Sequence, residues 1–188
     1  MSPFTRKNAL ALAGVCVLLS ACLLPDRFDA TLEVGAERAT LDYAGELVAV
    51  SAETEAATRE ALDTVAEDVR KDGGTVDYTV LAKGRARAAV HWTQATPAVG
   101  AKTTFADLVA IRRQADGALE IVTPALKDRD RAQLTKLGLG EASGRLCVKT
   151  TGTVVESNAK TTPNQSGGCH GWTITVLKDE PVRMLVRF

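Results

Sequence analysis

The thiols and imidazoles are the side chains of this 188-residue chain best suited to bind a metal or attack a substrate. They are Cys16, Cys22, Cys147, Cys169, His91 and His170. No C-x-x-C pair or ladder of ligands occurs, whereas zinc takes three or four protein ligands at recognisable spacings. G-x-S-x-G, P-loop and H-E-x-x-H sequences are also absent. The pattern therefore predicts no metal, no cofactor and no enzymatic activity.

The first segment reads as an export signal. Arg6 and Lys7 precede an uncharged run from Asn8 to Pro25, whose core, 9–19, is almost entirely apolar. Basic residues followed by such a run are typical of a secretory signal peptide. A membrane-spanning helix needs roughly 20 apolar residues, so spanning is the weaker interpretation.

Leu19, Ser20, Ala21 and Cys22 resemble the lipobox of bacterial lipoproteins at every position. The resemblance implies a signal peptide, 1–21, cut between Ala21 and Cys22, a diacylglyceryl group on the Cys22 thiol, and an acyl chain such as palmitate on the new amine. Two or three such chains, at about 0.8 kcal/mol per buried methylene, hold a protein on a membrane. Leu23 follows, and resemblance to enterobacterial lipoproteins then implies the outer membrane, facing the periplasm. The alternative is an ordinary signal peptide with Cys22 there by chance.

The mature chain, 22–188, is nearly neutral. The full chain has 23 Lys and Arg against 23 Asp and Glu, so phosphate-backbone attraction is weak and a nucleic-acid partner is not expected. Residues 53–72 carry a surplus of acids, which indicates a solvated helix face or an acidic docking face. Residues 83–113 carry a surplus of bases, which indicates a wet sheet face or a contact for anionic lipid, with Arg85 and Arg87 as candidate headgroup contacts.

Two cysteines remain once Cys16 leaves with the signal and Cys22 carries lipid. In an oxidising envelope Cys147 and Cys169 favour a disulfide, worth about 3 kcal/mol in the chain-entropy model, with two separate thiols as the alternative. A hairpin centred on the turn-rich stretch 158–168 would instead pair Cys147 with a residue near 178. Either the strands pair about Asn158, or Cys169 lies in a loop that folds back on the sheet, or there is no bond.

Hydrophobic periodicity predicts the elements that position these groups. Strands are expected at 28–34, 39–51, 74–82, 85–96, 145–157, 172–177 and 182–188. Helical spacing predicts a long amphipathic helix over 54–71 and a short helix over 127–137. Asp116-Gly117 predicts a hairpin turn between 105–114 and 118–123, with a helical first limb as the alternative. The predicted fold class is α+β, a single domain with an antiparallel sheet.

The C-terminal third contains the runs Gly152 to Ala159, Gly171-Trp172-Thr173-Ile174 and 182–188. Together these runs resemble the LppM-type envelope lipoprotein domain. The opening 22–25, with Arg27 to Leu32, is similar to the start of small lipoproteins of Gram-negative bacteria. The resemblance implies an α+β domain with an antiparallel sheet and an envelope role that involves lipid or glycolipid binding.

Two function classes stay open. The favoured one is a non-enzymatic structural or interaction role, in which an envelope protein meets the acidic or basic face. The alternative is a lipid or glycolipid binding module, since a curved sheet covered by the 54–71 helix could hold an apolar pocket. A lipid binder needs an apolar cavity of roughly several hundred Å³, whereas a scaffold can have a solid core.

Overall fold

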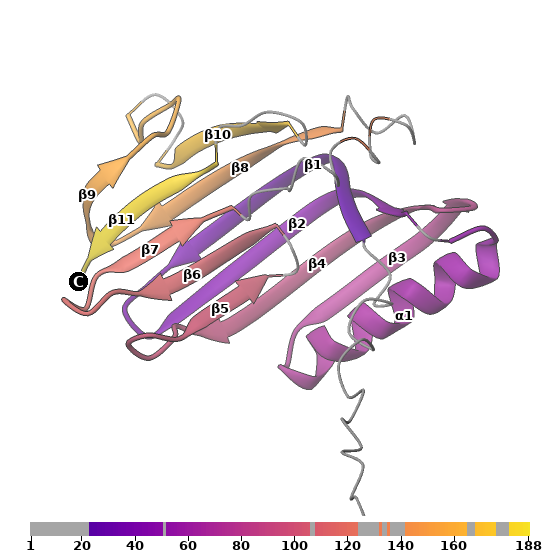
Figure 1. The fold of residues 1–188 in the computed structure, drawn as a ribbon, viewed down its shortest axis with the longest axis horizontal. Coiled ribbons are helices and arrows are strands. Elements are labelled where there is room, and N and C mark those ends of the chain that lie inside the picture. The colour runs from indigo at the N-terminus through magenta and orange to yellow at the C-terminus, as the bar shows by residue number, and fades with distance from the viewer. Residues whose placement is uncertain are drawn as a thin grey trace, which may run out of the picture.

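The computed structural model describes residues 23–50, 52–105, 108–123, 132, 135, 142–164, 168–175 and 181–188. Its first sheet contains β1 (Leu23–Val34), β2 (Arg38–Ala49), β3 (Thr75–Ala82), β4 (Arg85–Ala95), β8 (Ser143–Thr150) and β10 (His170–Thr175). Its second sheet contains β5 (Lys102–Phe105), β6 (Val109–Arg113), β7 (Leu119–Val122), β9 (Thr153–Ser157) and β11 (Arg183–Arg187). Helix α1 spans Glu55–Lys71 (Figure 1).

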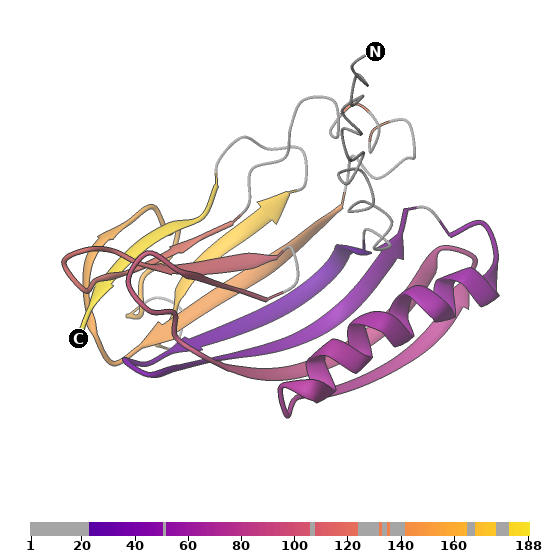
Figure 2. The ribbon, with the colours of Figure 1, turned by 60° about the horizontal axis from the view of Figure 1, so that its bottom comes forward.

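The two sheets and the helix form layers. The first sheet has the order β10-β8-β1-β2-β4-β3, and the second has the order β5-β6-β7-β11-β9. All neighbouring strands are antiparallel except β1 and β8, which run parallel. Figure 2 shows the first sheet curving, with α1 near the β3 end and the second sheet near the other. The second sheet and α1 thus cover adjacent parts of the same face of the first sheet.

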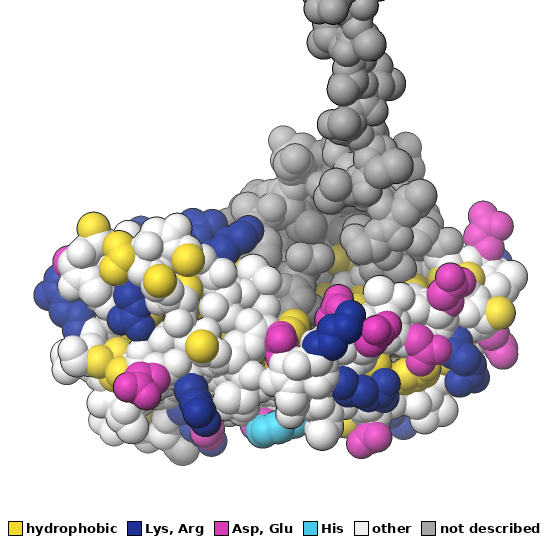
Figure 3. All heavy atoms as spheres, turned by 90° about the horizontal axis from the view of Figure 1, so that it is seen from below, with side chains coloured by type: hydrophobic (Ala, Val, Ile, Leu, Met, Phe, Trp, Pro, Cys, Tyr) yellow, Lys and Arg dark blue, Asp and Glu magenta, His cyan; other side chains and the backbone are white. Residues whose placement is uncertain are grey.

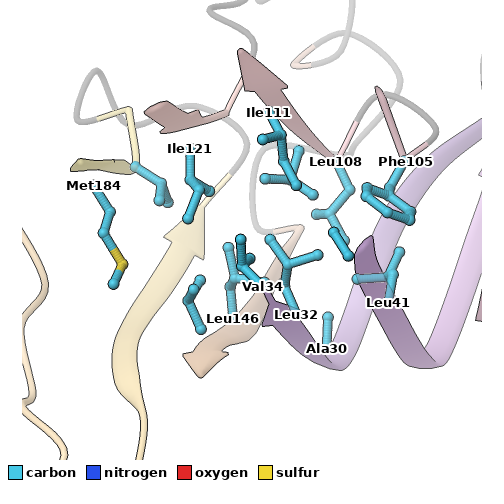
Figure 4. Close-up of a cluster of buried hydrophobic side chains, with 14 of the residues drawn as sticks. Ala30, Leu32, Val34, Leu41, Phe105, Leu108, Ile111, Ile121, Leu146 and Met184 are labelled. Carbon is cyan, nitrogen blue, oxygen red and sulfur yellow. The ribbon is translucent and has the colours of Figure 1, made fainter. Parts of the chain in front are cut away.

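Strand periodicity explains the main core. In β1 the side chains of Phe28, Ala30, Leu32 and Val34 are buried and alternate with more exposed ones, because successive side chains of a strand point to opposite faces. Opposite them lie side chains of the second sheet, and Ile111, Ile121 and Met184 among these are fully buried (Figure 4). Burial of each large aliphatic group contributes about 1.5 to 3 kcal/mol, so this contact between the sheets holds the fold together.

The residues at the two ends of helix α1 explain where it begins and ends. The Thr54 hydroxyl accepts a hydrogen bond from the Ala57 N–H at 3.1 Å, and Gly73 follows the helix with a φ of +80° that suits glycine. Ala66 and Val69 are buried against β3 and β4. The predicted helix over 54–71 is therefore confirmed in position and in the face that it buries.

The predicted fold class is wrong. The chain is mostly β, with two sheets and one helix of 17 residues in the described part, rather than α+β with a long and a short helix. The expected short helix, 127–137, lies outside the described residues apart from Ala132 and Thr135, which are both helical. The expected single strand 145–157 divides at Gly152 into β8 and β9, which belong to different sheets. A Cβ at position 152 would lie 2.7 Å from the Arg187 carbonyl oxygen, so only glycine fits where the chain crosses from one sheet to the other.

Candidate functional site

The predicted cleavage and lipidation residues, Ala21 and Cys22, lie outside the described residues. Leu23, the next residue, is the first of β1. Among the described residues no helix is long and apolar enough to cross a membrane. The signal peptide and the lipid anchor therefore stay predictions.

The two mature cysteines lie together. Cys147 of β8 is opposite Gly171 of β10, and Cys169 directly precedes β10. The Cα atoms of the two cysteines are 5.5 Å apart, a separation compatible with a disulfide. The predicted pairing is confirmed to this extent. The antiparallel pairing of β8 with β10 is centred on Ala159, one residue from the Asn158 of the first arrangement considered, so Cys169 lies just outside the ladder.

The histidines are not brought together. His91 lies on β4 and its Nδ1 is 2.6 Å from the carboxylate of Asp42, with both side chains more than half exposed. His170 lies on β10, four strand spacings away, and its buried Nδ1 has no hydrogen-bond partner among the described residues. Within the described ranges no group of three or more His, Cys, Asp or Glu side chains gathers to hold a metal ion. No catalytic pair emerges from these positions.

The arginines predicted to contact headgroups lie on the face of the first sheet away from α1. Arg85 is engaged, because its Nη1 donates to Asp26 and to Glu46 at 3.1 Å each. Arg27 donates to the same Glu46 carboxylate at 2.5 Å. These four residues form an ionic cluster with no net charge. Arg87, two residues along β4, is exposed.

Acidic residues from β1 and β2 thus offset the charge of Arg85, one of the bases of 83–113. Figure 3 shows acidic and basic side chains intermixed over the face that it displays. Such mixing cancels the long-range field that would attract a polyanion. The wet-face interpretation fits the paired Arg85 better than a headgroup contact, while a contact through Arg87 stays a prediction.

A β-bulge at the start of β1 sets which side chains face inward. The pairing with β2 shifts between Asp26 and Asp29, and Arg27 in the bulge has a φ of +46°, which is unusual for a non-glycine residue. Gly45 lies opposite, where a Cβ would be 2.4 Å from the Cβ of Phe28. The bulge changes the alternation, so that Pro25 and Phe28 both face the covered side of the sheet.

Tyr43 stacks on the Phe28 ring, with centroids 5.5 Å apart, and its hydroxyl donates to the Glu46 carbonyl at 2.6 Å. Burial, together with the nearby Asp26 and Glu46 carboxylates, raises the pKa of Tyr43 far above its ordinary value. The phenol is therefore neutral and its polar end is satisfied by the protein.

An apolar groove lies between α1 and the second sheet, where neither of them covers the first sheet fully. Its volume is about 60 Å³. The floor comes from β1, β2 and β4, one wall from α1, and the other from the end of β5 and the residue before β6. The lining residues are Leu23, Pro25, Leu41, Tyr43, Leu47, Val65, Val69, Val90, Trp92, Phe105 and Leu108.

The surface of the groove is almost entirely hydrocarbon and aromatic. Trp92 meets Phe105 edge to face, with centroids 5.6 Å apart, and its indole N–H donates to the Asp72 carboxylate at 3.3 Å. Tyr43 is also hydrogen-bonded to the protein. No polar atom of the groove is left to bind a polar ligand, within the described part of the chain.

No family model, curated protein or solved structure matches this chain. The resemblance to the LppM-type domain therefore stays a prediction, and the groove must be interpreted from its own chemistry. The sequence left open whether the helix and a curved sheet enclose an apolar pocket or a solid core, and the groove lies between them. It is smaller than the several hundred Å³ expected of a cavity that encloses a lipid.

A second depression, of about 410 Å³, lies on the outer face of the second sheet. Gln114, Asp116, Glu120 and Arg183 line it, and all four are at least partly exposed. Gln114 and Arg183 each contact the Glu120 carboxylate, at 2.8 and 3.7 Å, so the polar groups satisfy one another. This depression is larger than the groove, but its chemistry points to no ligand.

Proposed function

We propose that this protein is a lipid-anchored, non-enzymatic protein of the bacterial cell envelope whose groove holds a stretch of hydrocarbon chain from a membrane lipid. The observation that carries the proposal is the lining of the groove, eleven residues with no free polar group. Leu23, one of these residues, directly follows the predicted lipidation site at Cys22. The groove is therefore next to the point where the membrane anchor would begin.

The size of the groove decides how much of a lipid it can take. Pockets that enclose small molecules have volumes of roughly 300 to 1,000 Å³, far above the 60 Å³ found here. We therefore propose that one chain enters in part while the headgroup and the rest of the lipid stay outside. Each methylene removed from water contributes about 0.8 kcal/mol, so even a short inserted segment is held.

The membrane anchor makes such weak binding effective. A protein fixed to a bilayer meets lipid at a very high local concentration, which offsets a low intrinsic affinity. The same anchoring agrees with the signal-peptide and lipobox patterns and with a nearly neutral mature chain. An interaction role toward another envelope protein is the alternative, and the experiment below separates the two.

The test is native mass spectrometry of the full lipidated protein, released from lipid nanodiscs that supply the bilayer. The proposal predicts a co-purified adduct of lipid mass. Leu47→Asp, which places a carboxylate in the groove, is expected to remove the adduct because a charge is costly to bury against hydrocarbon. Val155→Asp is the matched control, since Val155 lies half exposed on β9 and away from the groove.

An unsubstituted protein that carries no lipid beyond its covalent anchor would contradict lipid binding in the groove and favour the interaction role. An adduct that both variants retain would place the lipid outside the groove. Circular dichroism of both variants checks that each is folded as well as the parent.

A further inference from the structure

The end of the molecule next to the anchor is defined by backbone pairing. Leu23 is opposite Ala49 in the β1–β2 ladder, and the Ala49 N–H donates to the Gly84 carbonyl at 2.9 Å. Adjacent strands lie about 4.8 Å apart, so Gly84 is roughly 10 Å from Leu23. Gly84 belongs to the turn between β3 and β4. This turn is thus a close neighbour of the residue that follows Cys22.

The turn is also held firmly. The Gly84 N–H donates to the buried hydroxyl of Thr58 in α1 at 2.7 Å, and Gly84 has a φ of +71° that suits glycine. The hairpin tip formed by Leu81, Ala82 and Lys83 projects beyond these contacts and all three residues are exposed. A rigid base with an exposed tip is suited to contact a surface.

The chemistry of the tip differs from that of its surroundings. Leu81 is 47% exposed, one of four large hydrophobic side chains exposed in the described residues. Lys83 forms no ion pair in the part of the chain that the structure describes, whereas Arg85 and Arg27 are held by Asp26 and Glu46. The tip therefore combines an exposed aliphatic group with a lysine that forms no ion pair with the described residues.

We infer that the hairpin tip Leu81–Lys83 docks on the surface of an anionic bilayer beside the lipid anchor. The inference rests on the proposed anchoring at Cys22. Leu81 enters the headgroup region and the Lys83 ammonium pairs with lipid phosphate, which is the complementary charge. Neither group would hold a free protein on a membrane, but an anchor on the residue before Leu23 supplies a high effective concentration.

Docking of the tip fixes the orientation of the domain. Anchor and tip provide two points of contact, so the start of β1 and the groove residues Leu23 and Pro25 are turned toward the bilayer. The opposite end of β1, Val34, is then about 36 Å away, because a strand rises about 3.3 Å per residue. The β1–β2 turn is expected to point away from the membrane.

This difference between the two ends supplies a matched control. Val99 is 60% exposed and precedes Gly100, whose N–H donates to the Arg113 carbonyl. Arg113 in turn donates to the Ala36 carbonyl at 2.8 Å in the β1–β2 turn. Val99 is therefore an exposed aliphatic residue at the far end of the molecule.

The experiment uses the full lipidated protein in vesicles of phosphatidylcholine with about 30% phosphatidylglycerol. Leu81→Cys and Val99→Cys each receive an environment-sensitive fluorophore, and lipids with a nitroxide in the headgroup region act as quenchers. The inference predicts a blue shift and quenching of at least about half of the emission at position 81, with almost none at position 99. Adding Lys83→Glu to the first variant is expected to reduce its quenching at least about twofold.

Flotation on a density gradient separates failure of the tip from failure of the anchor. Protein that floats but shows equal quenching at the two positions overturns the docking of the tip and leaves the anchor standing. Protein that does not float with the vesicles overturns the anchoring itself. It also overturns the docking of the tip, because the docking depends on the anchor.

Discussion

Replacing Thr58 by valine tests how α1 is joined to the β3–β4 turn. The Thr58 hydroxyl accepts from the Gly84 N–H at 2.7 Å and donates to the Thr54 carbonyl at 2.8 Å, and the residue is 1% exposed. Valine has nearly the same shape, so little packing is lost. The Thr54 carbonyl keeps the helical bond from the Thr58 N–H at 3.0 Å, whereas the Gly84 N–H is left buried without an acceptor.

The magnitude follows from that orphaned donor. An unsatisfied buried N–H costs about 1 to 3 kcal/mol, so Thr58→Val is expected to lower the free energy of unfolding by about 2 kcal/mol. For a chain of this size that corresponds to a fall in Tm of roughly 4 to 8 °C. Urea denaturation followed by circular dichroism measures the first quantity, and a thermal melt measures the second.

The control is Thr64→Val on the same helix. The exposed Thr64 hydroxyl donates only to the Glu60 carbonyl at 3.0 Å, so this variant should stay within about 0.5 kcal/mol of the parent. If both variants lose the same small amount of stability, the Gly84 N–H has found another acceptor and the reasoning about the fixed hairpin tip is refuted.

Three further outcomes are expected. Gly45→Ala should destabilise the fold by about 1 to 3 kcal/mol, because the new Cβ would lie 2.4 Å from the Cβ of Phe28, and an unchanged Tm would show that the bulge yields freely. Cys147→Ser should remove the two-dalton mass gain seen on reduction and lower stability by about 3 kcal/mol, and a parent with no such gain would contain free thiols. A hydrogen bond to Asp63 at 2.5 Å raises the pKa of Tyr78 above its ordinary value of 10.0, so the folded state holds this proton more tightly and stability falls as pH rises through that range. Asp63→Asn should bring the tyrosinate absorbance to lower pH, and an unchanged titration would contradict the assignment.

Local structure could be predicted from the sequence because its causes are local. The 54–71 helix and the Asp116-Gly117 hairpin both agree with the structure, since capping, turn chemistry and apolar spacing act over a few residues. The cysteine pairing was also anticipated. Its geometry stayed open because the span between Cys147 and Cys169 contains β9, a strand of the other sheet.

The division into two sheets could not be predicted, since strand periodicity does not say which strands pair. The parallel contact of β1 with β8 joins Phe28 to Gly144 across more than a hundred residues. The run 145–157 has strand character throughout, and its break depends on how closely Gly152 approaches β11. The fold class was wrong for this reason.

The same limit applies to the site. Arg85 looked like a free cation in its own strand, yet its partners Asp26 and Glu46 lie 59 and 39 residues away. The groove depends on a space between α1 and the second sheet, and only the helix side of that space was expected. The signal that could have indicated its floor is the alternation of Val90 and Trp92 in β4.

The most direct test of the central claim follows the fluorescence of Trp92 in the groove. The chain has two tryptophans, so Trp172→Phe leaves Trp92 as the only emitter. A brominated fatty acid is added as the quencher. Hydrocarbon binding in the groove predicts saturable quenching at one chain per protein, and its loss when Leu47→Asp is added. Quenching that never saturates, or that is the same with Leu47→Asp, would contradict the proposal that this groove holds a lipid chain.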